Sequence, residues 1–131
     1  MAFMTEVFKK LNYKDQEPIL ILSPPQSFES ELRQMSKRAR IHSTPEKGTK
    51  YSFALGFAPM KADLLKAAKI LLPAAEEDAV IWFAYPKQTS KAYTSDLNRE
   101  LCWAALAPLG IQPVRQIAID PDRSALRFKR T

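Results

Sequence analysis

The chain has 131 residues, and its 20 Lys and Arg residues exceed its 14 Asp and Glu residues, which gives a formal charge of +6. This length allows one domain with a sizeable core, and a composition of 46% hydrophobic residues excludes a disordered chain. The longest apolar run, Ala79 to Tyr85, is too short to cross a bilayer, so no membrane partner is expected. A single cysteine, Cys102, and an N-terminus without a signal-peptide layout favour a cytoplasmic location.

The first half of the sequence predicts two helices and three strands. A short helix is expected over 5–11, with Thr5 as its N-cap, and the apolar run Ile19–Leu22 is typical of a strand covered on both faces. Ser27 is a suitable N-cap for a second helix, in which apolar residues recur at helical spacing up to Ala39. Further strands are expected at 40–43 and 51–58, with a polar loop at 44–50 between them.

The second half continues the alternation and then changes character. A helix over 60–72 should end at Pro73, and 79–85 is the strongest candidate for a central strand. Ser95 is a plausible N-cap for the next helix, which Pro108 and Gly110 should terminate. Two strands follow, at 114–119 and 125–129, and the intervening sequence Asp-Pro-Asp-Arg suits a tight turn.

Strands that alternate with helices pair in parallel, whereas the last two strands should form an antiparallel hairpin. This arrangement resembles the S-adenosylmethionine (SAM) methyltransferase variant of the Rossmann fold. We therefore predict a single α/β domain over 1–131, in three layers, with a doubly wound and mostly parallel six-stranded sheet of order 2-1-3-4-6-5. The third parallel strand of the usual fold and its helix would be missing from one edge, so the fold would be truncated.

Short motifs in the C-terminal half resemble a small uncharacterised bacterial family, catalogued as domain of unknown function 3052. They are Ala-Tyr-Pro-Lys at 84–87, Ser90, Asp-Leu at 96–97 and Ser-Ala-Leu-Arg-Phe at 124–128. Members of that family carry Trp where this chain has Tyr85, and again where it has Arg123. The resemblance implies a bacterial protein of the same fold, and it brings no established function.

The sequence disfavours a SAM cofactor in two places. Glycines after the first strand let the backbone approach the cofactor, but the segment Ser23–Gln26 has no glycine and contains two prolines without N–H donors. An acid at the end of the second strand should bind the ribose hydroxyls, but that strand ends in His42-Ser43, and Glu46 lies beyond a proline. We therefore expect no cofactor.

Other common chemistries find little support. One histidine and one cysteine, distant in the sequence, make no metal-ligand cluster, and the three scattered glycines form no phosphate-binding loop. Cys102, in a predicted helix, is more typical of a buried thiol than of a nucleophile. No catalytic residue and no metal site is predicted.

A ligand site is expected where the chain order of the parallel strands reverses, beyond their carboxyl ends. Three loops should converge there, at 23–27, 58–60 and 86–91. They contain polar residues for which the sequence indicates no structural role. The candidate ligand-binding residues are Ser23, Gln26, Ser27, Pro59, Lys87 and Ser90. Lys91 is a further cation in the third loop, and the alternative is that this loop only connects a strand to a helix.

Three functions remain open on these grounds. The leading interpretation is a non-catalytic binding or interaction module on a truncated methyltransferase-like fold. The second is an enzyme, or a binder of a small anionic ligand, that uses a rebuilt pocket with Lys87 as the anion contact. The third is a nucleic-acid binder, which the dispersion of the basic residues disfavours, since only 37–40 and 127–130 are basic clusters. The oligomeric state is left open.

Overall fold

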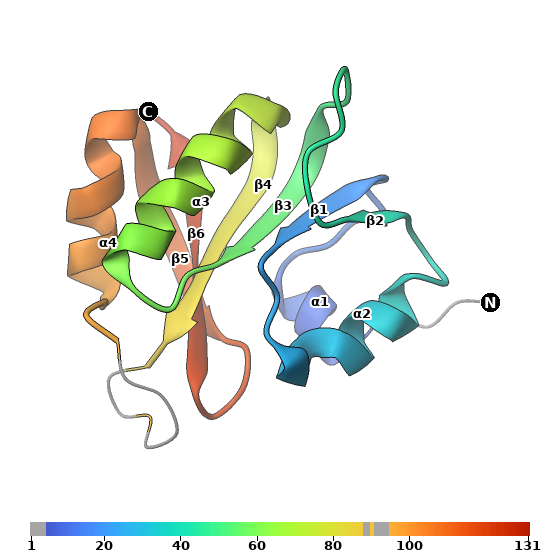
Figure 1. The fold of residues 1–131 in the computed structure, drawn as a ribbon, viewed down its shortest axis with the longest axis horizontal. Helices are drawn as coiled ribbons and strands as arrows, with labels where there is room; N and C mark the ends of the chain where they lie inside the picture. The colour runs from blue at the N-terminus through green and yellow to red at the C-terminus, as the bar shows by residue number, and fades with distance from the viewer. Residues whose placement is uncertain (1–4, 88–89, 91–94) are drawn as a thin grey trace.

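The computed structural model describes residues 5–87, 90 and 95–131. It contains one six-stranded sheet of order β2-β1-β3-β4-β6-β5. Helices α1 and α2 lie on one face of the sheet, and α3 and α4 lie on the other (Figure 1). Lys91, which the sequence assigned to a ligand loop, lies outside the described residues.

The strands are β1 Ile19–Leu22, β2 Ile41–His42, β3 Tyr51–Phe57, β4 Ala75–Pro86, β5 Ile111–Ala118 and β6 Arg123–Arg130. The helices are α1 Glu6–Lys10, α2 Glu29–Met35, α3 Lys61–Ala74 and α4 Arg99–Leu106, with 3₁₀ turns η1 Gln26–Phe28 and η2 Ala107–Leu109. Strands β1 to β4 pair in parallel, and β6 pairs antiparallel with both β4 and β5. The predicted fold class, strand order and C-terminal hairpin are confirmed.

Strand β4 carries the core on both of its faces, as an inner strand must. Ile81, Phe83 and Tyr85 belong to the apolar cluster under α3 and α4, whereas Trp82 and Ala84 belong to the cluster under α1 and α2. This alternation follows the two-residue period of a strand. It also fixes the side chain of Tyr85 on the face of the sheet that α3 and α4 cover.

The N-terminal segment is attached to the sheet through a buried side chain. Trp82 is fully buried, and its Nε1–H donates a hydrogen bond to the carbonyl of Leu11 over 2.8 Å. Thr5 caps α1 by accepting the N–H of Phe8, as the sequence predicts, and the Phe8 ring is also fully buried. The segment 5–11 therefore contributes the buried side chains of Phe8 and Leu11 to the core.

Helix boundaries differ from the sequence prediction in three places. Ser27 lies inside η1 and does not cap α2, which begins only at Glu29. The side chain of Asn98, not that of Ser95, caps α4 by accepting the N–H of Leu101 over 2.8 Å. Helix α3 continues to Ala74, one residue past Pro73. None of the described helices has the length and apolar character needed to span a membrane.

Candidate functional site at the carboxyl edge of the sheet

The turn that follows β1 has the backbone conformation that glycine usually provides. Ser23 has φ +52, in the left-handed region. Residues with a Cβ seldom adopt this backbone conformation, and those that do are often found at functional sites. The chain thus makes a glycine-like turn without a glycine, which residue types alone do not reveal.

A cavity of about 230 Å³ lies beside this turn, and we call it the Ser23 pocket. It is bounded by the ends of β1 and β3, by the segment after β2 and by the first half of α3. Its lining residues are Leu22, Ser23, Ser43, Thr44, Phe57, Asp63, Lys66, Ala67 and Ile70. The pocket therefore combines hydroxyl groups, one cation, one anion and apolar side chains.

A second and larger cavity, of about 510 Å³, lies on the face of the sheet that α4 covers, and we call it the Tyr85 pocket. The end of β4, the start of α4 and the β5–β6 hairpin form its walls. Its lining residues are Tyr85, Lys87, Asn98, Arg99, Glu100, Gln116 and Ser124. Its volume falls in the range of roughly 300–1,000 Å³ that is usual for small-molecule sites.

The hydroxyl of Tyr85 is buried without a hydrogen-bond partner among the described residues, although its ring is part of the core. Burial raises the pKa of Tyr85 to about 12; the nearby Cys102 acts in the same direction and Arg99 opposes it. The hydroxyl therefore keeps its proton at neutral pH. Burying a polar group without a partner costs stability, so this hydroxyl stands out as a candidate ligand contact.

The thiol of Cys102 is buried in α4, as the sequence predicts. Burial raises its pKa to about 12, and the charge of Asp96 contributes in the same direction. A thiol that stays protonated at neutral pH is a poor nucleophile. Cys102 is accordingly a core residue of α4.

We expect the free energy of unfolding to fall as pH rises from about 9 to about 12, because Tyr85 and Cys102 would ionise more readily in the unfolded chain. Their pKa values are raised by folding, so the stabilisation is complete below the unfolded values and is lost above them. Urea midpoints at a series of pH values should show a shallower alkaline fall in a Tyr85→Phe, Cys102→Ala double variant. Parallel curves for parent and variant would contradict this prediction.

Contacts at both ends attach the connection between β4 and α4 to neighbouring loops. The N–H of Lys87 donates to the carbonyl of Asp122 over 2.7 Å, and the Ser90 hydroxyl donates to the Asp122 carboxylate over 2.9 Å. At the other end, the Ser95 hydroxyl donates to the carbonyl of Pro59 over 2.5 Å. Ser90 and Pro59 therefore have structural contacts as well as positions at the predicted edge.

The structure distributes the six predicted ligand-binding residues over the edge. Ser23 lines the Ser23 pocket and Lys87 lines the Tyr85 pocket, and neither pocket is lined by the other four. Ser27 accepts a hydrogen bond from Arg123 Nη1 over 3.2 Å, and Gln26 begins η1. Tyr85 was not among the predicted ligand-binding residues, and neither were Asp63 and Lys66 of α3, which line the Ser23 pocket.

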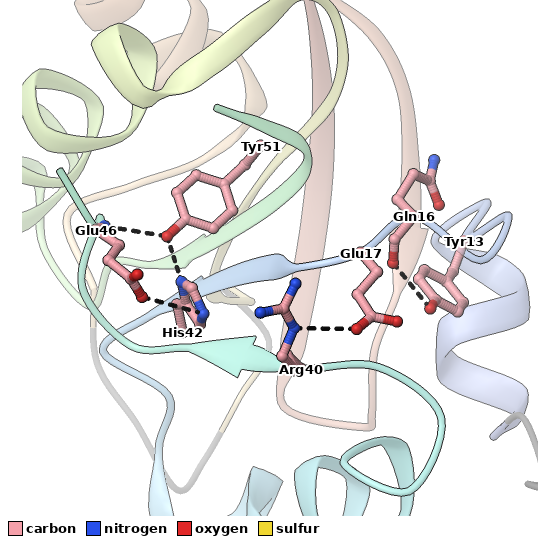
Figure 2. A network of polar contacts seen from close by, with 7 residues as sticks. All are labelled: Tyr13, Gln16, Glu17, Arg40, His42, Glu46 and Tyr51. Carbon is pink, nitrogen blue, oxygen red and sulfur yellow. Dashed lines mark hydrogen bonds and ion pairs between the residues drawn. The ribbon is translucent and has the colours of Figure 1, made fainter. Parts of the chain in front are cut away.

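The only histidine, His42, is engaged in a polar network that joins β2, the segment after it and the start of β3 (Figure 2). Its Nδ1 lies 2.5 Å from the Tyr51 hydroxyl, which also accepts the N–H of Glu46, and its Nε2 lies 3.5 Å from the Glu46 carboxylate. This network holds the segment after β2 against the start of β3. His42 lines neither of the two pockets.

Within the described residues, no group of three or more His, Cys, Asp or Glu side chains could hold a metal ion.

No family model matches the chain and no curated protein matches it, so the resemblance to domain of unknown function 3052 stays a prediction.

Solved structures, by contrast, share the fold at low sequence identity. A ribosomal protein L11 methylase from Lactobacillus delbrueckii subsp. bulgaricus aligns with a TM-score of 0.57 at 12% identity, over 95% of this chain and 75% of that chain. A SAM-dependent methyltransferase from Clostridium acetobutylicum also aligns with a TM-score of 0.57, at 11% identity, over 95% of this chain and 87% of that one. LepI in complex with SAM aligns with a TM-score of 0.59 at 10% identity, over 95% of this chain and 39% of LepI.

These comparisons correct one expectation from the sequence. We expected no cofactor and disfavoured SAM, and this is wrong, because structures of this fold include complexes with SAM and with SAH as well as a SAM-dependent methyltransferase. The expectation was based on residue types in the first loop, whose backbone at Ser23 has the left-handed conformation that glycine usually provides. The chain has the fold of SAM-dependent methyltransferases.

Proposed function

We propose that this protein is a non-catalytic binding module that holds an S-adenosyl ligand, SAM or its demethylated product SAH, in the Ser23 pocket. The observation that carries the proposal is the left-handed turn at Ser23 beside a cavity lined by both an acid and a base. The shared fold supports it, since ligands of open α/β sheets bind beyond the carboxyl ends of the strands.

The lining residues match the chemistry of such a ligand. Lys66 would pair with the carboxylate of the amino-acid part, and Asp63 would accept hydrogen bonds from the ribose hydroxyls. Asp63 replaces the acid that the sequence lacks at the end of β2. When bound, SAM would supply a sulfonium methyl group. The pocket is smaller than the usual range of roughly 300–1,000 Å³, so it would enclose only part of the ligand.

The engagement of the polar groups favours binding over catalysis. Asp63 Oδ2 accepts the N–H of Met60 over 3.1 Å, so this carboxylate already stabilises the start of α3. His42 is held between Tyr51 and Glu46, away from the pocket. A general base has to reach the proton that it removes. His42 does not line the Ser23 pocket, and Asp63, which does, already accepts a hydrogen bond at the start of α3.

Calorimetric titration of SAM and SAH tests the proposal. The parent should bind SAH, whereas Lys66→Met and Asp63→Asn should each weaken binding by at least about 10-fold, the loss typical of one charge-assisted contact. Lys69→Met, at another exposed lysine of α3 that does not line the Ser23 pocket, is the matched control and should bind like the parent. Equal affinities in all three variants would place the ligand elsewhere.

Methyl transfer is the second candidate function, and the Tyr85 pocket at the same edge of the sheet is the observation that favours it, since a transferase must also hold an acceptor. Incubation with methyl-labelled SAM and small nucleophiles distinguishes the two. A binding module releases SAM unchanged, whereas a transferase produces SAH.

A further inference from the structure

The Tyr85 pocket has features of a ligand site that the S-adenosyl proposal does not use. Tyr85 is 4% exposed, yet its hydroxyl has no partner among the described residues and its side chain lines the cavity. Natural proteins pair nearly all buried polar groups, and an exception is commonly explained by an absent water, ion or ligand. A protonated phenol would donate its hydrogen bond to an acceptor on that ligand.

The charge at this pocket favours an anion. Lys87 and Arg99 both line it, and in the part of the chain that the structure describes neither forms an ion pair. The acid Glu100 also lines the pocket, and it is exposed to solvent, as Arg99 is, so screening weakens both of these charges alike. Lys87, which is only partly exposed, leaves the pocket with a net positive charge beside a buried hydroxyl donor.

The start of α4 adds donors of the same kind. Asn98 accepts the N–H of Leu101, but the N–H groups of Arg99 and Glu100 in the first turn have no acceptor within the helix. All three residues Asn98, Arg99 and Glu100 line the pocket, so the positive end of the helix dipole lies at its wall. Helix starts of this type bind phosphate groups, which agrees with the charge argument.

A neighbouring hollow with an aromatic wall shares the side chain of Arg99 with this pocket. Arg99 lines both cavities, and the second one, of about 430 Å³, is also lined by Trp103 and Val114. Trp103 is 51% exposed, an unusual position for a large ring that could pack in a core. Since Trp103 follows Arg99 by one helical turn, a ligand held at Arg99 can also lie against this ring.

We propose that the Tyr85 pocket and the hollow beside Trp103 form one site for an organic phosphate. Tyr85, Lys87 and Arg99 hold the phosphate group, together with the N–H groups at the start of α4. The aromatic or apolar part of the ligand lies against Trp103. This site is separate from the Ser23 pocket, so it holds whether or not an S-adenosyl ligand binds there.

Thermal shift and calorimetry with inorganic phosphate and phenyl phosphate test this proposal, because neither probe contains a nucleoside that could enter the Ser23 pocket. The parent should bind both, and phenyl phosphate should bind about 2- to 10-fold more tightly through its ring. Trp103→Ala should abolish that difference between the probes and leave the affinity for inorganic phosphate unchanged.

Lys87→Met and Tyr85→Phe should each weaken the binding of both probes by about 10-fold or more. Since the Tyr85 hydroxyl has no partner, Tyr85→Phe should not lower stability without ligand, which separates loss of binding from misfolding. Lys47→Met removes an exposed lysine that lines neither pocket, and it should bind like the parent.

Equal phosphate responses in Lys87→Met, Lys47→Met and the parent would overturn the proposal, as would equal binding of the two probes by the parent. Unchanged SAH binding in Lys87→Met is expected, so the two proposals can fail independently.

Discussion

Replacing Leu126 with alanine is expected to lower the free energy of unfolding by about 2–5 kcal/mol, the usual cost of removing a buried leucine side chain. Leu126 is fully buried in β6, where it pairs with Phe83 of β4 on one side and with Gln116 of β5 on the other. The side chain lies in the apolar cluster under α3 and α4. A cavity left there is closed to solvent, because the face of β6 that carries Leu126 lies under α3 and α4.

Leu101→Ala is the matched control for this substitution. Leu101 lies in α4 with 46% of its surface exposed, so the same loss of side-chain atoms should cost less than about 1 kcal/mol. The urea midpoints of the two variants and the parent measure the difference in the free energy of unfolding, provided that this free energy depends equally steeply on urea concentration in all three proteins. If Leu126→Ala were no more destabilising than Leu101→Ala, β6 would not be an inner strand and the strand order would be wrong.

Trp82→Ala should cost about 3–5 kcal/mol, the range for large buried aromatic residues, and the substitution should also loosen the N-terminal segment. The indole is fully buried, and its N–H is bonded to the carbonyl of Leu11, which would lose its partner. Hydrogen exchange at the amides of Leu11 and Tyr13 should therefore accelerate more than exchange in β3.

Trp103→Ala provides the comparison, since it removes a tryptophan that is about half exposed on α4. It should change the free energy of unfolding by much less than Trp82→Ala does, and it should leave exchange at Leu11 unaffected. Equal destabilisation by the two substitutions would mean that Trp82 does not anchor the N-terminal segment to the sheet.

The fold could be predicted from the sequence because its signals are local and mutually consistent. The apolar run Ile19–Leu22 and the stretch 79–85 have the composition of strands covered on both faces, and both are inner strands of the sheet. The turn sequence at 120–123 marks the hairpin, in which Asp120 Oδ1 accepts the N–H groups of Asp122 and Arg123. Helix starts were less predictable, because several residues near each start are acceptable caps. For α4, Ser95 and Asn98 both qualify, but the Ser95 hydroxyl bonds to Pro59 and Asn98 caps the helix.

The candidate site could be predicted only in part, since it depends on backbone conformation and on which residues share a cavity. The general location beyond the strand ends follows from the topology, and Ser23 and Lys87 do line cavities there. The left-handed turn at Ser23 is invisible in residue types, and the wrong expectation about SAM was based on residue types alone. Tyr85 looked like a core residue because its ring is one, and the unpaired hydroxyl is apparent only from the surrounding contacts.

Titration of isotope-labelled protein with SAH, followed by amide chemical shifts, is the most direct test of the S-adenosyl proposal. We expect saturable shifts at Leu22, Ser23, Ser43, Thr44 and Ala67, which line the Ser23 pocket. Little change is expected at Gln116 and Ser124, which line the Tyr85 pocket. No saturable shift, or shifts confined to Gln116 and Ser124, would contradict it.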